Sequence, residues 1–172
     1  MTRRVLLAAC LVALACASAW AGSPDKAASA KQMEMMKAEM AKCAVCKEMA
    51  AHLDEIGPMK MDVVKMNNGM AIMHSVVNPK GVVVYHQTCE AIHKAGAACM
   101  TMTDEQAKTA LCPFCQGMRG AMKAGAKMSM GMTKKGDLMV VTSDDPVVQA
   151  QISALETKCE MMTAGSEPQA AK

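Results

Sequence analysis

Two C-x-x-C motifs are the residues of this chain best suited to chemistry. The first motif contains Cys43 and Cys46, and the second contains Cys112 and Cys115. This spacing brings two sulfur atoms within reach of one metal ion, of each other as a disulfide, or of a redox substrate. The sequence leaves open whether the two motifs share one ion or hold one each.

The residues beside each motif narrow this choice. Met49 and Met118 each follow the second cysteine of a motif by three residues, about one helical turn, and could add a thioether ligand. Haem attachment is excluded because Lys47 and Gln116 stand where C-x-x-C-H needs histidine. Thioredoxin-like exchange is disfavoured, since helical rather than strand sequence precedes each motif, and it would require a low thiol pKa.

A second set of candidate ligands lies in the first half of the chain. His86, Cys89 and His93 have the spacing i, i+3 and i+7, so one helix face offers imidazole, thiolate and imidazole. The two other histidines, His52 and His74, also precede the second motif. If nitrogen ligands take part, the first half therefore supplies them.

The softness of these ligands indicates the metal. Thiolates and thioethers favour Cu(I), whereas methionine is a poor zinc ligand. Zinc remains an alternative in a site of four cysteines, or of three cysteines and one histidine. The opposing interpretation is a set of structural disulfides. Seven cysteines follow residue 21, and an odd number cannot all pair within one chain.

The order of signals around the motifs occurs twice, which predicts an internal duplication. Each motif is followed by a Met- and Val-rich stretch with a turn at 67–69 or 134–137, and then by Asn78-Pro79 or Asp145-Pro146. The intervals from the first cysteine of the motif to the cysteine of the last helix, Cys89 or Cys159, are 46 and 47 residues.

Hydrophobic spacing predicts the elements that position these residues. In the first half we expect a helix over 31–56, a hairpin of 59–63 with 70–77, and a helix from Asn78-Pro79 to about Ala95.

The second half repeats this order. We expect helices up to Leu111, from Pro113 and over 146–162, and strands over 127–133 and 137–143. A single hairpin is rarely stable by itself. The sequence therefore predicts an α+β fold, a tandem helix–hairpin–helix unit with a four-stranded antiparallel sheet covered by helices on one face.

Methionine is the most distinctive component of the composition. Twenty of the 21 methionines follow residue 21, and they must fill much of the core because other large apolar residues are few. Met128, Met130 and Met132 alternate along one strand and therefore share a face, which we expect to be sheet core. Met59 and Met61 show the same alternation in the first half.

The N-terminus predicts export. Arg3-Arg4, an apolar run and the small-residue site Ala19–Ala21 are typical of a signal peptide. Cys16 lies in an alternative lipoprotein site, which would anchor the chain through a lipid. We therefore expect a protein of the periplasm or cell surface. Its predicted divisions are a signal peptide (1–21), a tether (22–30), repeat 1 (31–98), repeat 2 (99–163) and a polar tail (164–172).

Composition also excludes some functions. The net charge is +3, or +1 without Arg3 and Arg4, and there is no basic run. Only Tyr85 and Phe114 are aromatic beyond residue 21, so the chain has neither the charge nor the stacking residues of a nucleic-acid-binding protein. No nucleophile elbow, metalloprotease motif or phosphate loop is present, and we do not expect an enzyme.

The two motifs resemble known copper modules. A C-x-x-C pair with a nearby methionine is similar to the element of exported copper lipoproteins of the NosL type and to the heavy-metal modules called YHS domains. The methionine stands one position later here, and Tyr85-His86 with Cys89 resembles the second half of a YHS domain. The resemblance implies copper handling.

Together these features predict an exported soft-metal-binding protein that delivers or sequesters copper. Its partners would be the metal ion and another exported metal-handling protein. The alternative is a disulfide-stapled structural or interaction domain with a methionine-filled core and no metal.

Overall fold

The computed structural model describes the backbone of residues 26–163 and the side chains of residues 34–160. The chain divides after Met33, within α1, and the cores and the site described below lie in the part from Glu34 onward. The predicted signal peptide, the lipid-anchor residue Cys16 and the polar tail lie outside the described residues.

The same order of elements occurs in both halves of the chain. The first half contains α1 (Lys26–Lys42), α2 (Lys47–Ile56), β1 (Met59–Met66), β2 (Gly69–Val76), the 3-10 helix η1 (Pro79–Gly81) and α3 (Val82–Cys99). The second half contains α4 (Asp104–Ala110), α5 (Pro113–Lys123), β3 (Lys127–Met132), β4 (Gly136–Thr142) and α6 (Pro146–Thr163). This order is compatible with the predicted duplication.

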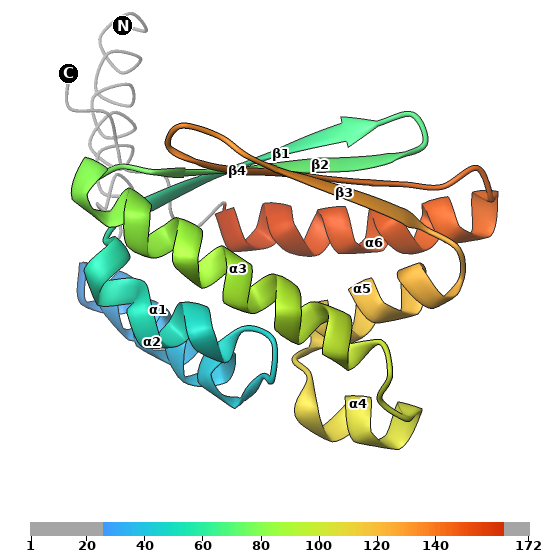
Figure 1. Ribbon diagram of the computed structural model, residues 1–172, viewed down its shortest axis with the longest axis horizontal. Coiled ribbons are helices and arrows are strands. Elements are labelled where there is room, and N and C mark those ends of the chain that lie inside the picture. Colours follow the sequence, from blue (N-terminus) through green and yellow to red (C-terminus); the bar gives the residue numbers. More distant parts are fainter. Residues whose placement is uncertain (1–25, 164–172) are drawn as a thin grey trace, which may run out of the picture. The chain divides into compact units, whose positions relative to one another are not determined.

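The four strands form one antiparallel sheet in the order β1-β2-β4-β3, which confirms the predicted α+β fold (Figure 1). The two hairpins meet along β2 and β4. Their register is symmetric about the pair Ile72–Met139, because Gly69 pairs with Thr142 at one end and Gly136 pairs with Ser75 at the other. The two hairpins therefore occupy equivalent places in the sheet.

The two glycines that open β2 and β4 make this close pairing geometrically feasible. A Cβ atom on Gly69 would lie 1.9 Å from the Val141 carbonyl oxygen, and one on Gly136 would lie 1.9 Å from the His74 carbonyl oxygen. Any larger residue would have to push the central strands apart.

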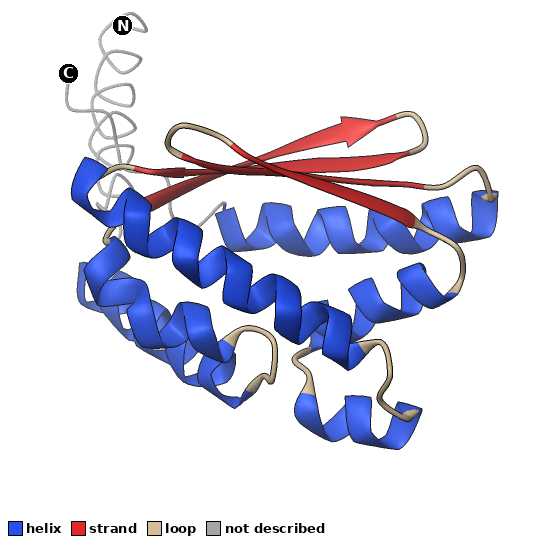
Figure 2. Cartoon of the chain, in the orientation of Figure 1, coloured by secondary structure: helices blue, strands red, loops and turns tan. Residues whose placement is uncertain are grey.

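Helices cover one face of the sheet (Figure 2). Helix α6 packs on β1, β2 and β4, and α5 packs on α6. These elements enclose what we call the sheet core, which includes Met70, Ile72, Val141 and Ile152. A second group, the helical core, lies among the helices and includes Cys43, Val45, Cys99, Ala107, Leu111 and Cys115.

Three of the predicted helix boundaries require correction. The helix expected over 31–56 is two helices, because the chain turns at Cys43–Cys46 before α2 begins. Helix α1 begins at Lys26, inside the segment expected to be a tether. Helix α3 continues past Gly96 to Cys99, since nothing blocks the helix there and its last turns pack in the helical core.

The methionine row of β3 also differs from expectation. Met128 is 42% exposed and Met132 is 45% exposed, so these side chains are not sheet core. The reason is tertiary, because α6 packs mainly against the other three strands. No helix in the described part of the chain is long and apolar enough to span a membrane.

Candidate metal centre

The first motif forms the turn between α1 and α2. Cys43 follows the last residue of α1, and Cys46 is the N-cap residue of α2. The turn is tied to the second half of the chain, because the amide of Ala44 donates a hydrogen bond to the carbonyl of Ala110 at 2.8 Å. This bond holds the first motif beside the end of α4.

The second motif begins α5. Cys112 is the N-cap residue, in an extended conformation, and Pro113 occupies the first turn, where its missing N–H costs nothing. Cys115 lies in the same turn and is buried. A thiolate at a helix N-terminus is stabilised by the partial positive charge of the helix dipole, which favours the ionised form of Cys112.

The two motifs meet in a single group, which we call the four-cysteine cluster. The Sγ atoms of Cys43, Cys46, Cys112 and Cys115 all lie within 4.8 Å of one another. The Sγ of Cys46 lies 3.4 Å from that of Cys115 and 4.0 Å from that of Cys112. The halves therefore share one cluster. It is the one such group of potential metal ligands among the His, Cys, Asp and Glu residues that the structure describes.

Three thiols of the cluster differ in the direction in which their pKa values are shifted. Hydrogen bonds from Cys115 and Cys46 lower the pKa of the Cys112 thiol. The pKa values of Cys46 and Cys115 are raised, chiefly because their protons are held in hydrogen bonds to Cys112, and burial adds to the effect. One thiolate can thus form first and be stabilised by two neighbouring S–H groups.

The geometry of the cluster suits a soft ion. A tetrahedral ion with metal–sulfur bonds of about 2.3 Å holds its sulfur atoms about 3.8 Å apart, close to the two spacings given above. Cys43 is 1% exposed and Cys115 is 9% exposed, whereas Cys46 and Cys112 are half-buried. The four-cysteine cluster could therefore hold one soft metal ion with two ligands inside the protein and two nearer its surface.

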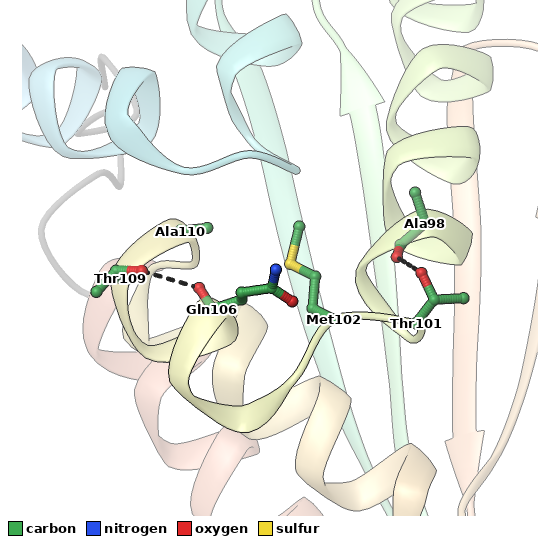
Figure 3. A pocket seen from close by; sticks show the side chains of 6 residues that line it. All are labelled: Ala98, Thr101, Met102, Gln106, Thr109 and Ala110. Atoms are coloured by element: carbon green, nitrogen blue, oxygen red, sulfur yellow. Dashed lines mark hydrogen bonds between the residues drawn. The ribbon is translucent and has the colours of Figure 1, made fainter.

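An open pocket adjoins the helical core. Its volume is about 560 Å³, and it is lined by Ala98, Thr101, Met102, Gln106, Thr109 and Ala110. Figure 3 shows the Met102 side chain reaching between the end of α3 and helix α4. Met102 also packs against the core that contains Cys43 and Cys115. Met102, which motif spacing did not indicate, thus contacts both the pocket and the helical core.

Cys99 and Arg119 are two further residues that the sequence analysis missed. Cys99 is buried in the helical core, and its Sγ donates to the Gly96 carbonyl at 3.0 Å. Burial raises the pKa of its thiol, and the nearby Arg119 guanidinium opposes the rise. The spacing of four residues between Cys115 and Arg119 on one helix was the available signal, since such residues share a face.

Arg119 fixes the connection between α3 and α4 on α5. Its Nε donates to the Cys99 carbonyl at 3.0 Å, another nitrogen donates to the Met102 carbonyl, and a third pairs with Asp104 at 2.7 Å. Arg119 is only 7% exposed. Its hydrogen bonds therefore hold the backbone of Cys99 and Met102 against the helical core.

The methionines predicted as auxiliary ligands pack in other parts of the molecule. Met49 packs in a cluster with Ile56, Val76 and Tyr85, and Met118 packs in the sheet core. Neither is among the side chains that pack in the helical core with the four cysteines. The structure thus brings together the four predicted cysteines and leaves Met49 and Met118 on other faces of their helices.

The predicted set of His86, Cys89 and His93 is likewise dispersed. His86 donates from Nε2 to the Gly136 carbonyl at 3.1 Å, and His93 is exposed. Cys89 is buried beside Tyr85, and burial raises the pKa of its thiol to about 11. The described residues at these three positions do not form a group of converging ligands.

A buried hydrogen-bond network centred on Asp137 lies beside the helix that carries this set. Its Oδ1 accepts hydrogen bonds from Tyr85 Oη at 2.7 Å and from His74 Nδ1 at 2.9 Å. Burial alone would raise the pKa of Asp137, but these hydrogen bonds lower it. The network joins β2, β4 and α3 and gives this end of the sheet a fixed arrangement.

Comparison of the chain with protein-family models, with curated proteins and with solved structures finds no match.

Proposed function

We propose that this protein is an exported soft-metal-binding protein that holds Cu(I) in the four-cysteine cluster for delivery or sequestration. The observation that supports the proposal is the convergence of Cys43, Cys46, Cys112 and Cys115 to within 4.8 Å. The two motifs are far apart in the sequence, and random placement of four thiols on two turns would rarely produce such a group.

The ligand set favours copper over harder metals. The cluster presents sulfur alone, and thiolate sulfur is a soft ligand that suits Cu(I), as it also suits zinc and iron–sulfur clusters. No carboxylate or imidazole belongs to the cluster, and Met102 packs in the same helical core. The resemblance of the motifs to exported copper modules supports the same ion.

The unequal burial of the thiols supports exchange of the ion. Cys46 and Cys112 are half-buried and lie 4.0 Å apart. A partner protein with its own soft ligands could reach these two sulfurs first, while Cys43 and Cys115 retain the ion from the buried side. Another exported metal-handling protein is the partner that this arrangement would suit.

Zinc is the second candidate, and a specific observation favours it. A tetrahedral set of four thiolates is also the ligand set of structural zinc sites. Here it would join the α1–α2 turn to the start of α5, two segments that the Ala44–Ala110 hydrogen bond already holds together. In that case the ion would stabilise the fold and would not be cargo.

Metal content of the protein isolated from its native compartment tests the proposal. Copper close to one equivalent, with thiols that react only after the metal is removed, would support it; one equivalent of zinc would support the structural alternative. No metal and about one free thiol would contradict both and favour the disulfide-stapled domain.

A paired substitution locates the site. We expect Cys46→Ser with Cys112→Ser to lose the bound ion, because two of four ligands are gone, and to fold, because both positions are half-buried. The matched control is Cys159→Ala, a thiol buried in the sheet core. Retention of the ion by the paired variant would overturn the assignment to this cluster.

A further inference from the structure

The exposed methionines of β3 carry an inference that does not depend on the cysteine cluster. Met128, Met130 and Met132 pair across to Val141, Met139 and Asp137 of β4. Paired residues of neighbouring strands point to the same face. Val141 is completely buried in the sheet core, so this face is the one that the helices cover. The three thioethers thus point to the helix-covered face, on the edge strand β3, whereas α6 packs mainly on β1, β2 and β4.

The equivalent positions on the opposite edge strand, β1, provide a comparison. In the symmetric register of the sheet, the three β3 positions correspond to Met61, Val63 and Lys65 of β1. Met61 and Val63 pack against the sheet core, and the third position is an exposed lysine. On β3, thioethers occupy all three positions, although Met128 and Met132 are 42% and 45% exposed. Packing therefore does not account for methionine at these two sites.

Met139, which is half-buried and packs against the sheet core, adds a fourth thioether beside the row. It lies directly opposite Met130, where facing Cβ atoms are about 5 Å apart, and Met128 and Met132 each lie about 6.7 Å from Met130 along the strand. Methionine has three rotatable side-chain bonds, so its sulfur can move over several ångströms. Met130, Met139 and either flanking methionine can therefore direct three sulfurs to one ion.

The chemistry of the row selects a particular class of ion. Thioethers are neutral and soft, and they bind Cu(I) in preference to zinc or to hard cations. The carboxylate opposite Met132, that of Asp137, already accepts hydrogen bonds from His74 and Tyr85. We propose that Met128, Met130, Met132 and Met139 form a second, thioether-only Cu(I) site on the β3 edge, separate from the four-cysteine cluster.

This site differs from the cysteine cluster in the atoms that hold the ion. Replacing methionine by leucine removes the thioether sulfur and leaves the four thiols of the cluster in place, whereas replacing Cys46 and Cys112 by serine does the reverse. The Cu(I) bound at each site can therefore be measured as the difference between the native protein and one variant.

The experiment is an anaerobic Cu(I) titration of the whole reduced mature chain at neutral pH, against a chromophoric Cu(I) chelator. The test variant is Met128→Leu, Met130→Leu and Met132→Leu, because leucine keeps the apolar volume and removes the sulfur. The control variant is Met36→Leu, Met73→Leu and Met100→Leu, whose methionines are 38%, 39% and 38% exposed at other places.

We expect the native protein and the control variant each to bind one Cu(I) more than the test variant binds. The ε-methyl signals of Met128, Met130, Met132 and Met139 should shift when the ion binds. The proposal is overturned if the test variant binds as much Cu(I) as the native protein, or if the control variant loses an ion too. The variant Cys46→Ser with Cys112→Ser should keep this ion, so failure of the cysteine assignment and failure of the thioether site give different results.

Discussion

The two C-x-x-C motifs have the same spacing but sit differently on their helices. In the first half the second cysteine, Cys46, is the N-cap residue of its helix, whereas in the second half it is the first cysteine, Cys112. In each half the N-cap cysteine is half-buried, and its partner, Cys43 or Cys115, is buried. The cluster thus has two interior and two accessible sulfurs, and in each half the accessible sulfur belongs to the cysteine at the helix N-cap.

A second difference between the halves occurs in the sheet. The position after the glycine that opens the second strand is Met70 in β2 and Asp137 in β4. Met70 is completely buried in the sheet core, while Asp137 is buried among hydrogen-bond donors. Equivalent backbone positions therefore support an apolar core at one end of the sheet and a polar network at the other.

The largest expected effect comes from comparing removal of the buried cysteine pair with removal of the half-buried pair. Cys43→Ser with Cys115→Ser should abolish metal binding and also destabilise the metal-free protein, because a buried hydroxyl left without a partner costs about 1–3 kcal/mol. The accessible pair, Cys46→Ser with Cys112→Ser, should lose the metal with little change in the free energy of unfolding. Metal stoichiometry and urea unfolding of the reduced apoprotein measure the two effects.

Equal destabilisation of the apoprotein by both paired variants would contradict the division into interior and accessible sulfurs. It would mean that the difference in burial between the two pairs has no energetic consequence.

Much of this arrangement was predictable from local sequence, and some of it was not. The two motifs, the hairpins and the glycine turn signals are local, and they predicted both the α+β sheet and the four cysteines. The local sequence left open whether the motifs share one cluster, because their convergence arises from packing between distant segments, which the Ala44–Ala110 bond accompanies. The exposure of Met128 and Met132 depends on where α6 lies, and hydrophobic alternation along β3 contains no information about that.

Residues outside the motifs were missed for a related reason. Arg119 shares a helix face with Cys115, and Asp137 alternates with Met139 and Val141, but charged residues are seldom fully buried, so their type favoured exposure over their spacing. Only the packed structure shows that both are buried, with partners supplied by the backbone around Cys99 and by His74 and Tyr85.

The next largest effect tests the polar end of the sheet. We expect Asp137→Asn to lower the free energy of unfolding by about 2 kcal/mol at neutral pH, because Tyr85 and His74 lose a charged acceptor. The pKa of Asp137 is lower in the folded state, so its contribution is complete above the unfolded pKa of about 3.9 and is lost as the pH falls through the folded value.

Urea unfolding of the reduced apoprotein between about pH 5 and about pH 2 measures this dependence. His74, Tyr85 and His93 are the groups whose charge or hydrogen bond acts on Asp137, and all three remain in the variant. Native protein should lose stability in acid more steeply than Asp137→Asn. Parallel pH profiles for the two proteins would show that the network does not contribute through the carboxylate charge.

The smallest effect distinguishes the two edge strands. Met61→Ala on β1 should cost about 2 kcal/mol, since its side chain packs against the sheet core and truncation leaves a cavity. Met132→Ala on β3 should change stability by less than about 0.5 kcal/mol, since that side chain is 45% exposed. Urea unfolding of the two variants gives the comparison directly. If Met132→Ala costs as much as Met61→Ala, then packing explains the β3 methionines and the case for a thioether site there is lost. If only Met61 matters to stability, the residues that the fold does not need at the β3 edge are the ones whose sulfur remains available to bind an ion.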